Sequence, residues 1–291
     1  MKIIFFSRER VNHSPQDIER IFTQIEHYGL SCCINFEVKD KIENILSRRF
    51  SDHEVYGESF PVVDKEAVIL CYGGDGTILD AVNRLEGQQI PIVGINSGRV
   101  GFLACAISSD IEQLFKAIVE GDLSVEQRDM LSISGDFLDV DKPLLAANEL
   151  SVHRFGATMI ATELLLNGEL VATYHGDGVV IATPTGSTAY SLSAGGPILV
   201  PACSSFVVTP LAPHNMALRP LVIPATANIV LRVSSRDGDA NVSIDNRTYP
   251  IGQSAVIEIN RAKGSLYLSR WGNKSFYDTL RDKMMWGLDL R

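Results

Sequence analysis

The chain has 291 residues, of which 45% are hydrophobic and 21% charged, and its 26 Lys and Arg against 35 Asp and Glu give a formal net charge of −9. These values are typical of a globular protein and exclude a disordered chain. The acidic balance argues against a general nucleic-acid binder, because neutralising phosphates requires a cationic surface. The length suggests two domains or one large one.

Targeting and metal-binding signals are absent from the sequence. The N-terminal apolar run Ile3–Phe6 is too short for a secretory signal peptide, and no run approaches the ~18 apolar residues of a membrane span. The five cysteines contain no C-x-x-C pair, so neither a disulfide framework nor a zinc site is predicted. We therefore expect a cytoplasmic protein whose thiols are free and buried.

Strand and helix signals alternate over residues 1–125. Strands are predicted at residues 2–7, 32–36, 67–72 and 90–95. Helices are predicted after Ser14, over residues 38–49, after Thr77 and between Ser109 and Gly121. Ser14 is placed as an N-cap, and Pro15 follows it at the first helical position. Because strands that alternate with helices imply a parallel sheet covered on both faces, we expect a Rossmann-like α/β domain here.

The pattern changes to a period of two over residues 126–273, which predicts a second, β-rich domain. Alternating runs flank Asn167-Gly168, the strongest short signal for a β-hairpin. A second hairpin is predicted from residues 229–233 to 241–244, with its turn at 236–239. Residues 274–291 return to a helical pattern.

The segment Gly73-Gly74-Asp75-Gly76-Thr77 lies between a predicted strand and a predicted helix. Glycines there let backbone N–H groups approach a phosphate, and a helix N-terminus favours anions. No Lys-Ser/Thr pair follows at the P-loop spacing. An acid beside phosphates is repulsive unless it accepts a hydroxyl proton, orients that hydroxyl or holds Mg²⁺. The alternative is a tight turn closed by an Asx-type bond from Asp75.

A second segment is rich in hydroxyl groups. The eleven residues from Thr183 to Ser193 contain six Ser or Thr hydroxyls and Tyr190, on a backbone constrained by Pro184 and Gly186. Such a segment suits a sugar-phosphate ligand, although its composition is equally that of a solvent loop. Asn148-Glu149 borders an apolar segment, where the pair binds an adenine or ribose edge or forms a cap or turn.

These segments, in this order and at these separations, resemble the NAD kinase family. The specific motif is the long one, Asp177–Pro197, because the Gly73–Thr77 pattern is shared with lipid kinases. The resemblance extends over nearly the whole chain after about residue 67. It implies an α/β domain over residues 1–125, a β-rich NAD-binding domain over 126–273, and a C-terminal helix over 274–291 that packs back on the first domain.

The resemblance also implies an activity and the residues that perform it. Members transfer the γ-phosphoryl group of ATP to the 2′-hydroxyl of the adenosine ribose of NAD, with Mg²⁺ expected to neutralise charge. Asp75 would accept or orient the proton of that hydroxyl, and Gly76 would bring its N–H near the ligand. Asn148 and Glu149 would bind the ribose and amine on the adenine side. The NAD pocket would be lined by Thr188, Ala189, Tyr190, Ser191, Leu192 and Ser193, with Tyr190 stacking on a base.

Three further residues follow from the resemblance. Asp177 would meet the nicotinamide half of NAD across a subunit interface, which implies a homodimer or homotetramer with a shared site. His175 falls where the family often has a basic residue tied to the choice between NAD and NADH, or is an ordinary loop residue. Arg247 falls where many members have Gln, in a segment that here reads Asp245-Asn246-Arg247.

The C-terminal segment carries an apolar stripe and an excess of cations. Phe276, Tyr277, Leu280 and Met284 recur at helical spacing, and the resemblance implies that Met284, Met285 and Trp286 are core residues. Residues 261–291 contain seven Lys or Arg against three acids, which form a patch facing polyphosphate or a solvated helix face.

Two other functions remain open from the sequence. A lipid or sphingoid-type kinase would share Gly73–Thr77, but it leaves Asp177–Pro197 unexplained and the chain has no basic amphipathic membrane helix. A non-catalytic binder of NAD or NADP differs from an enzyme only in turnover. A Rossmann dehydrogenase fits poorly, because the first strand is followed by Ser7-Arg8-Glu9-Arg10 and not by G-x-G-x-x-G.

Overall fold

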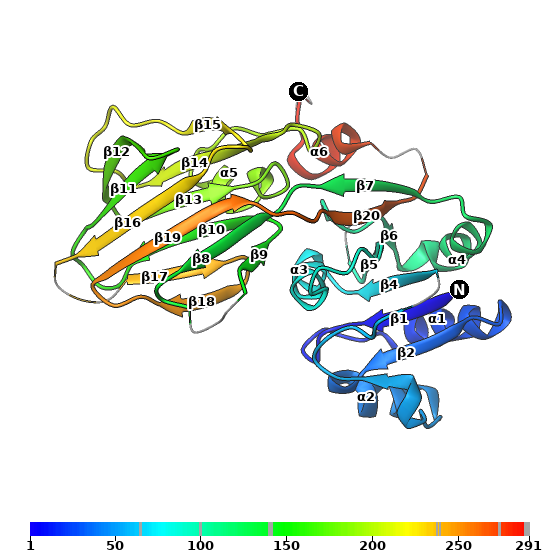
Figure 1. Ribbon diagram of the computed structural model, residues 1–291. Helices are drawn as coiled ribbons and strands as arrows, with labels where there is room; N and C mark the ends of the chain where they lie inside the picture. Colours follow the sequence, from blue (N-terminus) through cyan, green and yellow to red (C-terminus); the bar gives the residue numbers. More distant parts are fainter. Residues whose placement is uncertain are drawn as a thin grey trace. The chain divides into compact units, whose positions relative to one another are not determined.

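The computed structural model describes residues 1–63, 66–98, 101–138, 142–236, 238, 240–272 and 275–287. These described residues belong to two compact units (Figure 1). The first unit consists of Met1–Gln127 together with Tyr267–Arg291, and the second of Arg128–Leu266. The first unit is therefore built from two segments of chain that the second unit separates in sequence.

The first unit is built on a mostly parallel sheet. In spatial order its strands are β3 (Val55–Tyr56), β2 (Ser31–Asn35), β1 (Lys2–Phe6), β4 (Ala67–Tyr72), β5 (Ile92–Asn96), β20 (Leu266–Arg270) and β7 (Ser124–Arg128), with β6 (Ala106–Ile107) beside β5. Neighbours from β3 to β20 run parallel, as the alternation of strands and helices predicts. Figure 1 shows the late strand β20, in orange, beside the green β7.

Amphipathic helices complete the first unit. They are α1 (Pro15–His27), α2 (Lys39–Leu46), α3 (Asp75–Arg84), α4 (Ile111–Glu120) and α6 (Phe276–Met284), with 3₁₀ turns η1 (Phe36–Val38), η2 (Asp52–Glu54) and η3 (Ser108–Asp110). Ser14 caps α1 by accepting the N–H of Asp17, as expected. The apolar face of α1, from Ile18 to Ile25, packs in one core with β1, β4 and β5. Among the described residues, no helix is long and apolar enough to span a membrane.

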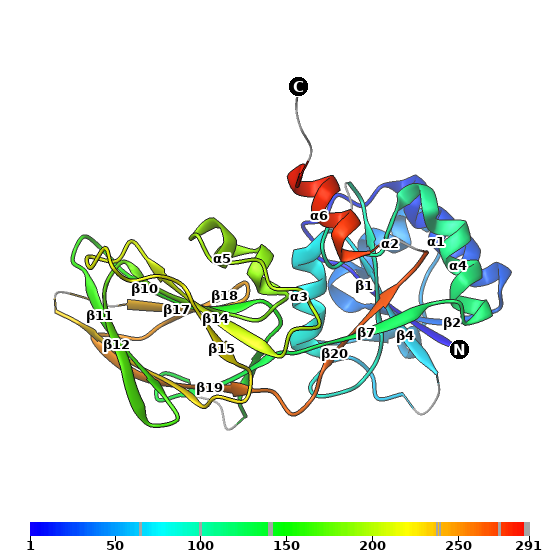
Figure 2. The same cartoon turned by 90° about the horizontal axis from the view of Figure 1, so that it is seen from above.

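The second unit is an antiparallel β-sandwich, whose two layers are seen in Figure 2. One sheet has the order β15 (Leu221–Pro224), β14 (Ser205–Leu211), β13 (Gly178–Ala182), β10 (Glu149–Arg154), β17 (Ala240–Ile244) and β18 (Arg247–Pro250). The other has the order β12 (Glu169–Gly176), β11 (Ile160–Leu166), β16 (Ile229–Ser235), β19 (Ser254–Arg261), β8 (Leu131–Gly135) and β9 (Leu144–Ala146). One apolar core fills the space between them, since inward side chains alternate along each strand.

One of the two predicted hairpins is present. Asn167 and Gly168 adopt positive φ angles of 52° and 86° and join β11 to β12, as the Asn-Gly signal predicts. The second prediction is wrong, because β16 and β17 lie in different sheets and the chain passes between layers there. Residues 237 and 239 of that predicted turn lie outside the described residues. Instead β17 pairs with β18 across Asp245-Asn246.

A short 3₁₀ turn η4 (Gly186–Thr188) and the single-turn helix α5 (Tyr190–Ser193) follow β13 in the second unit. They carry most of the hydroxyl-rich segment. The alternative of a solvent loop does not hold for Thr183, Ser187 and Ser191, which are fully buried.

The predicted C-terminal helix is α6, but its last apolar residues are not core. Leu280 is only 6% exposed, and the rings of Phe276 and Phe102 lie 6.1 Å apart. Met284, Met285 and Trp286 are 36%, 58% and 55% exposed. The stripe breaks because α6 ends at Met284 and Met285 adopts a left-handed φ of 52°, which turns the chain away.

Three of the seven cations of the C-terminal segment pair with carboxylates. Arg261 pairs with Asp129 at 2.7 Å, and Arg270 pairs with Glu126 at 3.0 Å. Arg281 pairs with Asp278 one turn earlier on α6. This pairing favours solvated ion pairs over a free cationic patch for these three side chains.

Candidate functional site

The glycine loop, residues 73–77, lies at a topological switch point of the parallel sheet. Strand β1 connects to β2 on one side, whereas its neighbour β4 connects to β5 on the other. In open α/β sheets ligands bind outside the carboxyl ends of the strands at such a point. Gly73 has φ 147°, and a Cβ there would lie 2.3 Å from Thr77 Oγ1, so the turn into α3 requires glycine.

Asp75 is the first residue of α3, and the backbone of another loop holds its carboxylate. Phe102 N–H donates to Asp75 Oδ2 at 2.9 Å, and Leu103 N–H donates to Oδ1 at 3.3 Å. The Asx-type bond within its own turn is therefore not what orients this side chain. Both oxygens are fixed by groups 27 and 28 residues away, and each keeps lone-pair capacity for a ligand.

Gly101 makes this arrangement sterically feasible. A Cβ on Gly101 would lie 1.9 Å from Asp75 Oδ1, far inside any contact distance, so any side chain there would push the carboxylate away. The sequence alone assigned no role to Gly101. The need for glycine at this position comes from the contact between this loop and α3, so the residues around Gly101 in the sequence do not indicate it.

In the second unit, hydrogen bonds from buried hydroxyls fix the hydroxyl-rich segment. Thr183 Oγ1 donates to Ala147 O at 2.6 Å, and Ser187 Oγ donates to Pro184 O at 2.6 Å. Ser191 Oγ bonds Thr209 Oγ1 at 2.8 Å. A Cβ on Gly186 would lie 2.2 Å from Asn148 O, so this segment packs directly on the Asn148-Glu149 backbone.

Asp245 organises the backbone around Asn148-Glu149. Its carboxylate accepts the N–H groups of Ala147, Asn148 and Glu149 at 2.8, 2.8 and 3.1 Å. In return, Asp245 N–H donates to Glu149 O at 2.9 Å. Arg247 follows the turn and donates from Nη2 to Leu145 O at 2.9 Å. The pair predicted as ligand-binding is thus presented on a braced strand end.

Glu149 is buried with one oxygen unused. Its Oε2 has no hydrogen-bond partner within the described parts of the chain. Burial, and then the nearby Asp245 carboxylate, raise the pKa of Glu149 from 4.5 to about 8, against a lowering contribution from the Tyr190 backbone N–H. Near pH 7 this side chain is therefore mainly protonated and able to donate as well as accept.

The raised pKa of Glu149 predicts a pH-dependent stability. Its protonated form favours the native state fully below pH 4.5, and this contribution is lost as pH rises toward 8, because only the unfolded state ionises in that window. Relative to Glu149→Gln, the wild-type free energy of unfolding should fall by about 3–4 kcal/mol between about pH 5 and pH 8. Calorimetric melting across this range measures the difference.

The matched control for this experiment is Glu163→Gln. Glu163 is an exposed carboxylate of the same unit, 3.8 Å from Arg232. Its pH curve should run parallel to wild type. Parallel curves for Glu149→Gln as well would contradict a buried, protonated Glu149.

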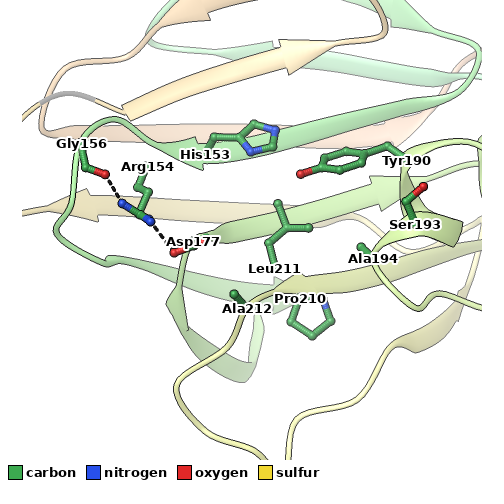
Figure 3. Close-up of a pocket in the computed structure, with 10 residues that line it drawn as sticks. All are labelled: His153, Arg154, Gly156, Asp177, Tyr190, Ser193, Ala194, Pro210, Leu211 and Ala212. Carbon is green, nitrogen blue, oxygen red and sulfur yellow. Dashed lines mark hydrogen bonds and ion pairs between the residues drawn. The ribbon is translucent and has the colours of Figure 1, made fainter.

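A cavity of about 540 Å³ opens beside this cluster in the second unit (Figure 3). The rings of His153 and Tyr190 both line it and stack on each other, with their centroids 5.5 Å apart. Arg154 Nε pairs with Asp177 Oδ1 at 2.5 Å at one end. The remaining lining residues are Gly156, Ser193, Ala194, Pro210, Leu211 and Ala212. Aromatic faces, an apolar floor and one ion pair suit a ligand with both a flat ring and polar groups.

The predicted residues do not all meet at this cavity. Asp177, Tyr190 and Ser193 line it, and the backbone N–H of Tyr190 connects it to Glu149. Ser191 lies behind it with its hydroxyl bonded, and Thr188 Oγ1 donates back to Thr185 O. His175 is exposed on β12 and lines a separate groove with Arg232 and Arg236. Asp75 and Gly76 belong to the first unit.

Sequence reasoning missed His153 and Arg154 altogether. Each carries a chemical group into the cavity from β10, which begins at Glu149. Burial lowers the pKa of His153, against the raising effect of Asp177, so the ring favours its neutral form. The available signal was a pair of polar residues four and five positions beyond Glu149, on the same predicted β-rich domain.

The described residues do not assemble a protein-built metal centre. No group of three or more His, Cys, Asp and Glu side chains among them is arranged to hold a metal ion. At the glycine loop, Asp75 offers one carboxylate, both of whose oxygens already accept N–H groups. A Mg²⁺ ion would therefore need most of its ligands from nucleotide phosphates and water.

Both units of the chain match known protein families. Residues 33–123 match the ATP-NAD kinase N-terminal domain, and residues 147–270 match the ATP-NAD kinase C-terminal domain. The NAD kinase of Porphyromonas gingivalis is 40% identical over 292 residues, covering 100% of this chain and 99% of that protein. The NAD kinase of Bacteroides fragilis is 35% identical, with full coverage of both.

Solved structures share the fold. Yeast NADH kinase complexed with NADH matches with a TM-score of 0.84 at 22% identity, covering 100% of this chain and 89% of that one. An NAD kinase from Archaeoglobus fulgidus in complex with ATP matches with a TM-score of 0.74 at 25% identity, covering 98% and 99%. Matches to both family domains, and full-length relatives well above 30% identity, lead to one conclusion: the chain belongs to the NAD kinase family.

Proposed function

We propose that the protein transfers the γ-phosphoryl group of ATP to the 2′-hydroxyl of the adenosine ribose of NAD, forming NADP. The observation that carries the proposal is the Asp75 carboxylate, held by Phe102 and Leu103 in a glycine loop at the switch point of the sheet. Family membership supports both substrates. A loop that only binds phosphate has no use for a carboxylate, whereas a phosphoryl-transfer site uses one to act on the acceptor hydroxyl.

Asp75 would act on the acceptor hydroxyl. Its fixed oxygens accept the 2′-hydroxyl proton or hold that hydroxyl in line with the transferred group, and the Gly76 N–H lies beside the ligand. Phosphoryl transfer depends mostly on positioning and on electrostatic stabilisation, so a rigid carboxylate is well suited to it. Two backbone donors supply that rigidity.

The second unit would supply the NAD pocket. Asn148 and Glu149 bind the ribose and amine on the adenine side, and a protonated Glu149 can donate to a ring nitrogen. Tyr190 stacks on a base, as it already stacks on His153. The remaining contacts come from Thr188, Ala189, Ser191, Leu192 and Ser193, of which Ser191 contributes by positioning, since its hydroxyl is occupied.

Three further parts of the proposal extend the site. Asp177 meets the nicotinamide half of NAD in a homodimer or homotetramer with a shared site, where Arg154 orients it. His175 contributes to the choice between NAD and NADH, and Arg247 replaces a glutamine contact. ATP enters as its Mg²⁺ complex, in which phosphate oxygens and water hold most of the metal's coordination sites.

The direct test is NADP formation by the purified protein supplied with ATP, Mg²⁺ and NAD, followed with an NADP-specific dehydrogenase. We expect turnover that depends on all three. A protein that gains melting temperature with NAD but forms no NADP would be a non-catalytic binder. A protein that neither binds nor phosphorylates NAD would contradict the proposal, and lipid hydroxyls would be the next acceptors to try.

A further inference from the structure

Arg8 is a cation beside the glycine loop to which the proposed reaction assigns no task. It follows β1, and β1 pairs in parallel with β4 up to Phe6 and Cys71. Arg8 therefore emerges at the same sheet edge as Gly73, on the other side of the switch point. This is the edge at which a phosphate-bearing ligand is expected.

The guanidinium lies across the first turns of α3. A Cβ on Gly76 would stand 2.9 Å from Arg8 Nη1, so the group packs directly over the loop backbone. Arg8 Nε is ion-paired with Asp80 on the next turn of the helix. Nη1 and Nη2 have no hydrogen-bond acceptor among the described residues, and the side chain is 22% exposed. The Nε edge of the guanidinium is thus anchored, whereas the N–H groups of Nη1 and Nη2 are available to a ligand.

The loop that carries Arg8 is held in place at several points. Val11 N–H donates to Arg8 O at 3.1 Å, and Lys41 Nζ donates to Val11 O at 3.1 Å. Ser7 Oγ donates to Tyr72 O at 2.7 Å, directly before the glycine loop. His13 Nε2 lies 2.9 Å from Ser7 Oγ, and burial lowers the pKa of this ring to about 4, so it stays neutral. The main-chain position of Arg8 is therefore fixed relative to Tyr72.

The carboxylates on α3 make a cation necessary for phosphate binding at the glycine loop. Asp75 and Asp80 both lie on α3, so an approaching polyphosphate meets two carboxylates, and the loop has no P-loop lysine. A guanidinium with free parallel donors matches phosphate oxygens bidentately. We propose that Arg8 binds phosphate oxygens of a nucleotide substrate at the glycine loop. The phosphates of ATP are favoured, because Asp75 is already assigned to the acceptor hydroxyl of NAD.

This inference rests on the proposed phosphoryl transfer, and its test separates the two. With the active enzyme, Arg8→Met should raise the KM for ATP by about 10-fold or more and leave the KM for NAD within about 2-fold. Arg8→Lys should restore part of the loss, because it keeps the charge without the fork. Titration calorimetry with inorganic tripolyphosphate, which has neither base nor sugar, should show weaker binding by Arg8→Met, independently of turnover.

Two comparison variants distinguish phosphate binding from a merely structural ion pair. Asp80→Asn breaks the pair but leaves the cation, so its effect on the ATP KM should be at least ~3-fold smaller than that of Arg8→Met. Arg20→Met removes an ion pair of the same kind, between Arg20 of α1 and Glu112 of α4, and should behave as wild type.

A rise in the NAD KM alone would identify the NAD diphosphate as the ligand and support the proposal. Equal effects of Arg8→Met and Asp80→Asn, or unchanged tripolyphosphate affinity, would overturn it, whereas an inactive wild type would instead fail the proposed function.

Discussion

Replacing Asp75 by Asn is expected to lower kcat for NADP formation by at least ~10²-fold while the protein stays folded. Asparagine has nearly the same shape, and its carbonyl oxygen still accepts one of the two N–H groups that hold Asp75. It cannot take up a proton, and its NH₂ group faces the second N–H donor. The loss should therefore appear in kcat, with the KM for NAD changed much less.

The measurement needs a control for the lost backbone bond. An N–H left without an acceptor costs about 1–3 kcal/mol, so Asp75→Asn should melt at a slightly lower temperature. Asp110→Asn is the matched variant, because Asp110 accepts the N–H of Ile107 at 3.1 Å in the same unit. It should lose similar stability and keep its activity. Wild-type kcat in Asp75→Asn would exclude a proton-accepting or orienting role.

Gly101→Ala should impair the reaction although Gly101 itself makes no proposed contact to substrate. The added Cβ would stand 1.9 Å from Asp75 Oδ1 and 2.4 Å from Cγ, so the carboxylate has to move. A misplacement of about 1 Å at a reacting group can cost ~10²-fold, and we expect a loss of kcat of ~10- to 10²-fold. Steady-state kinetics together with a melting curve would record it.

Gly98→Ala tests whether the effect is specific. Gly98 lies after the same strand, β5, but its nearest atom to an added Cβ is Asn96 Oδ1 at 3.8 Å, an ordinary contact. This variant should keep wild-type activity and stability. Equal losses in both variants would point to general sensitivity of the loop and not to displacement of Asp75.

Local signals in the sequence predicted much of the fold. Ser14-Pro15 placed the start of α1, because a cap and a proline act within one turn. Asn167-Gly168 placed the β11–β12 hairpin, because a two-residue turn with positive φ angles fixes its own register. Gly73 and Gly74 lie between β4 and α3 as expected, and Asp75 to Thr77 form the first turn of α3. In each case the residues that decide the conformation are neighbours in sequence.

The parts that could not be predicted depend on residues far apart in the chain. Nothing near Asp75 indicates that Phe102 and Leu103 hold its carboxylate, nor that Asp245 would brace the backbone at Asn148 from 97 residues away. The failed hairpin has the same origin, because β16 and β17 are consecutive but belong to different layers. Arg8 acquires significance only when parallel pairing brings β1 beside β4.

The split of the first unit has a consequence for how the protein is made. Its sheet requires β20, which lies between β5 and β7 and is translated only after residues 128–265. At ~5–20 residues/s, a ribosome takes roughly 7–30 s to cross that stretch. During this time β5 and β7 are edges without their neighbour, whereas the contiguous sandwich can finish folding first. The first unit therefore completes its folding last, and a nascent chain stalled before residue 266 would expose a sheet that lacks β20 to chaperones and proteases.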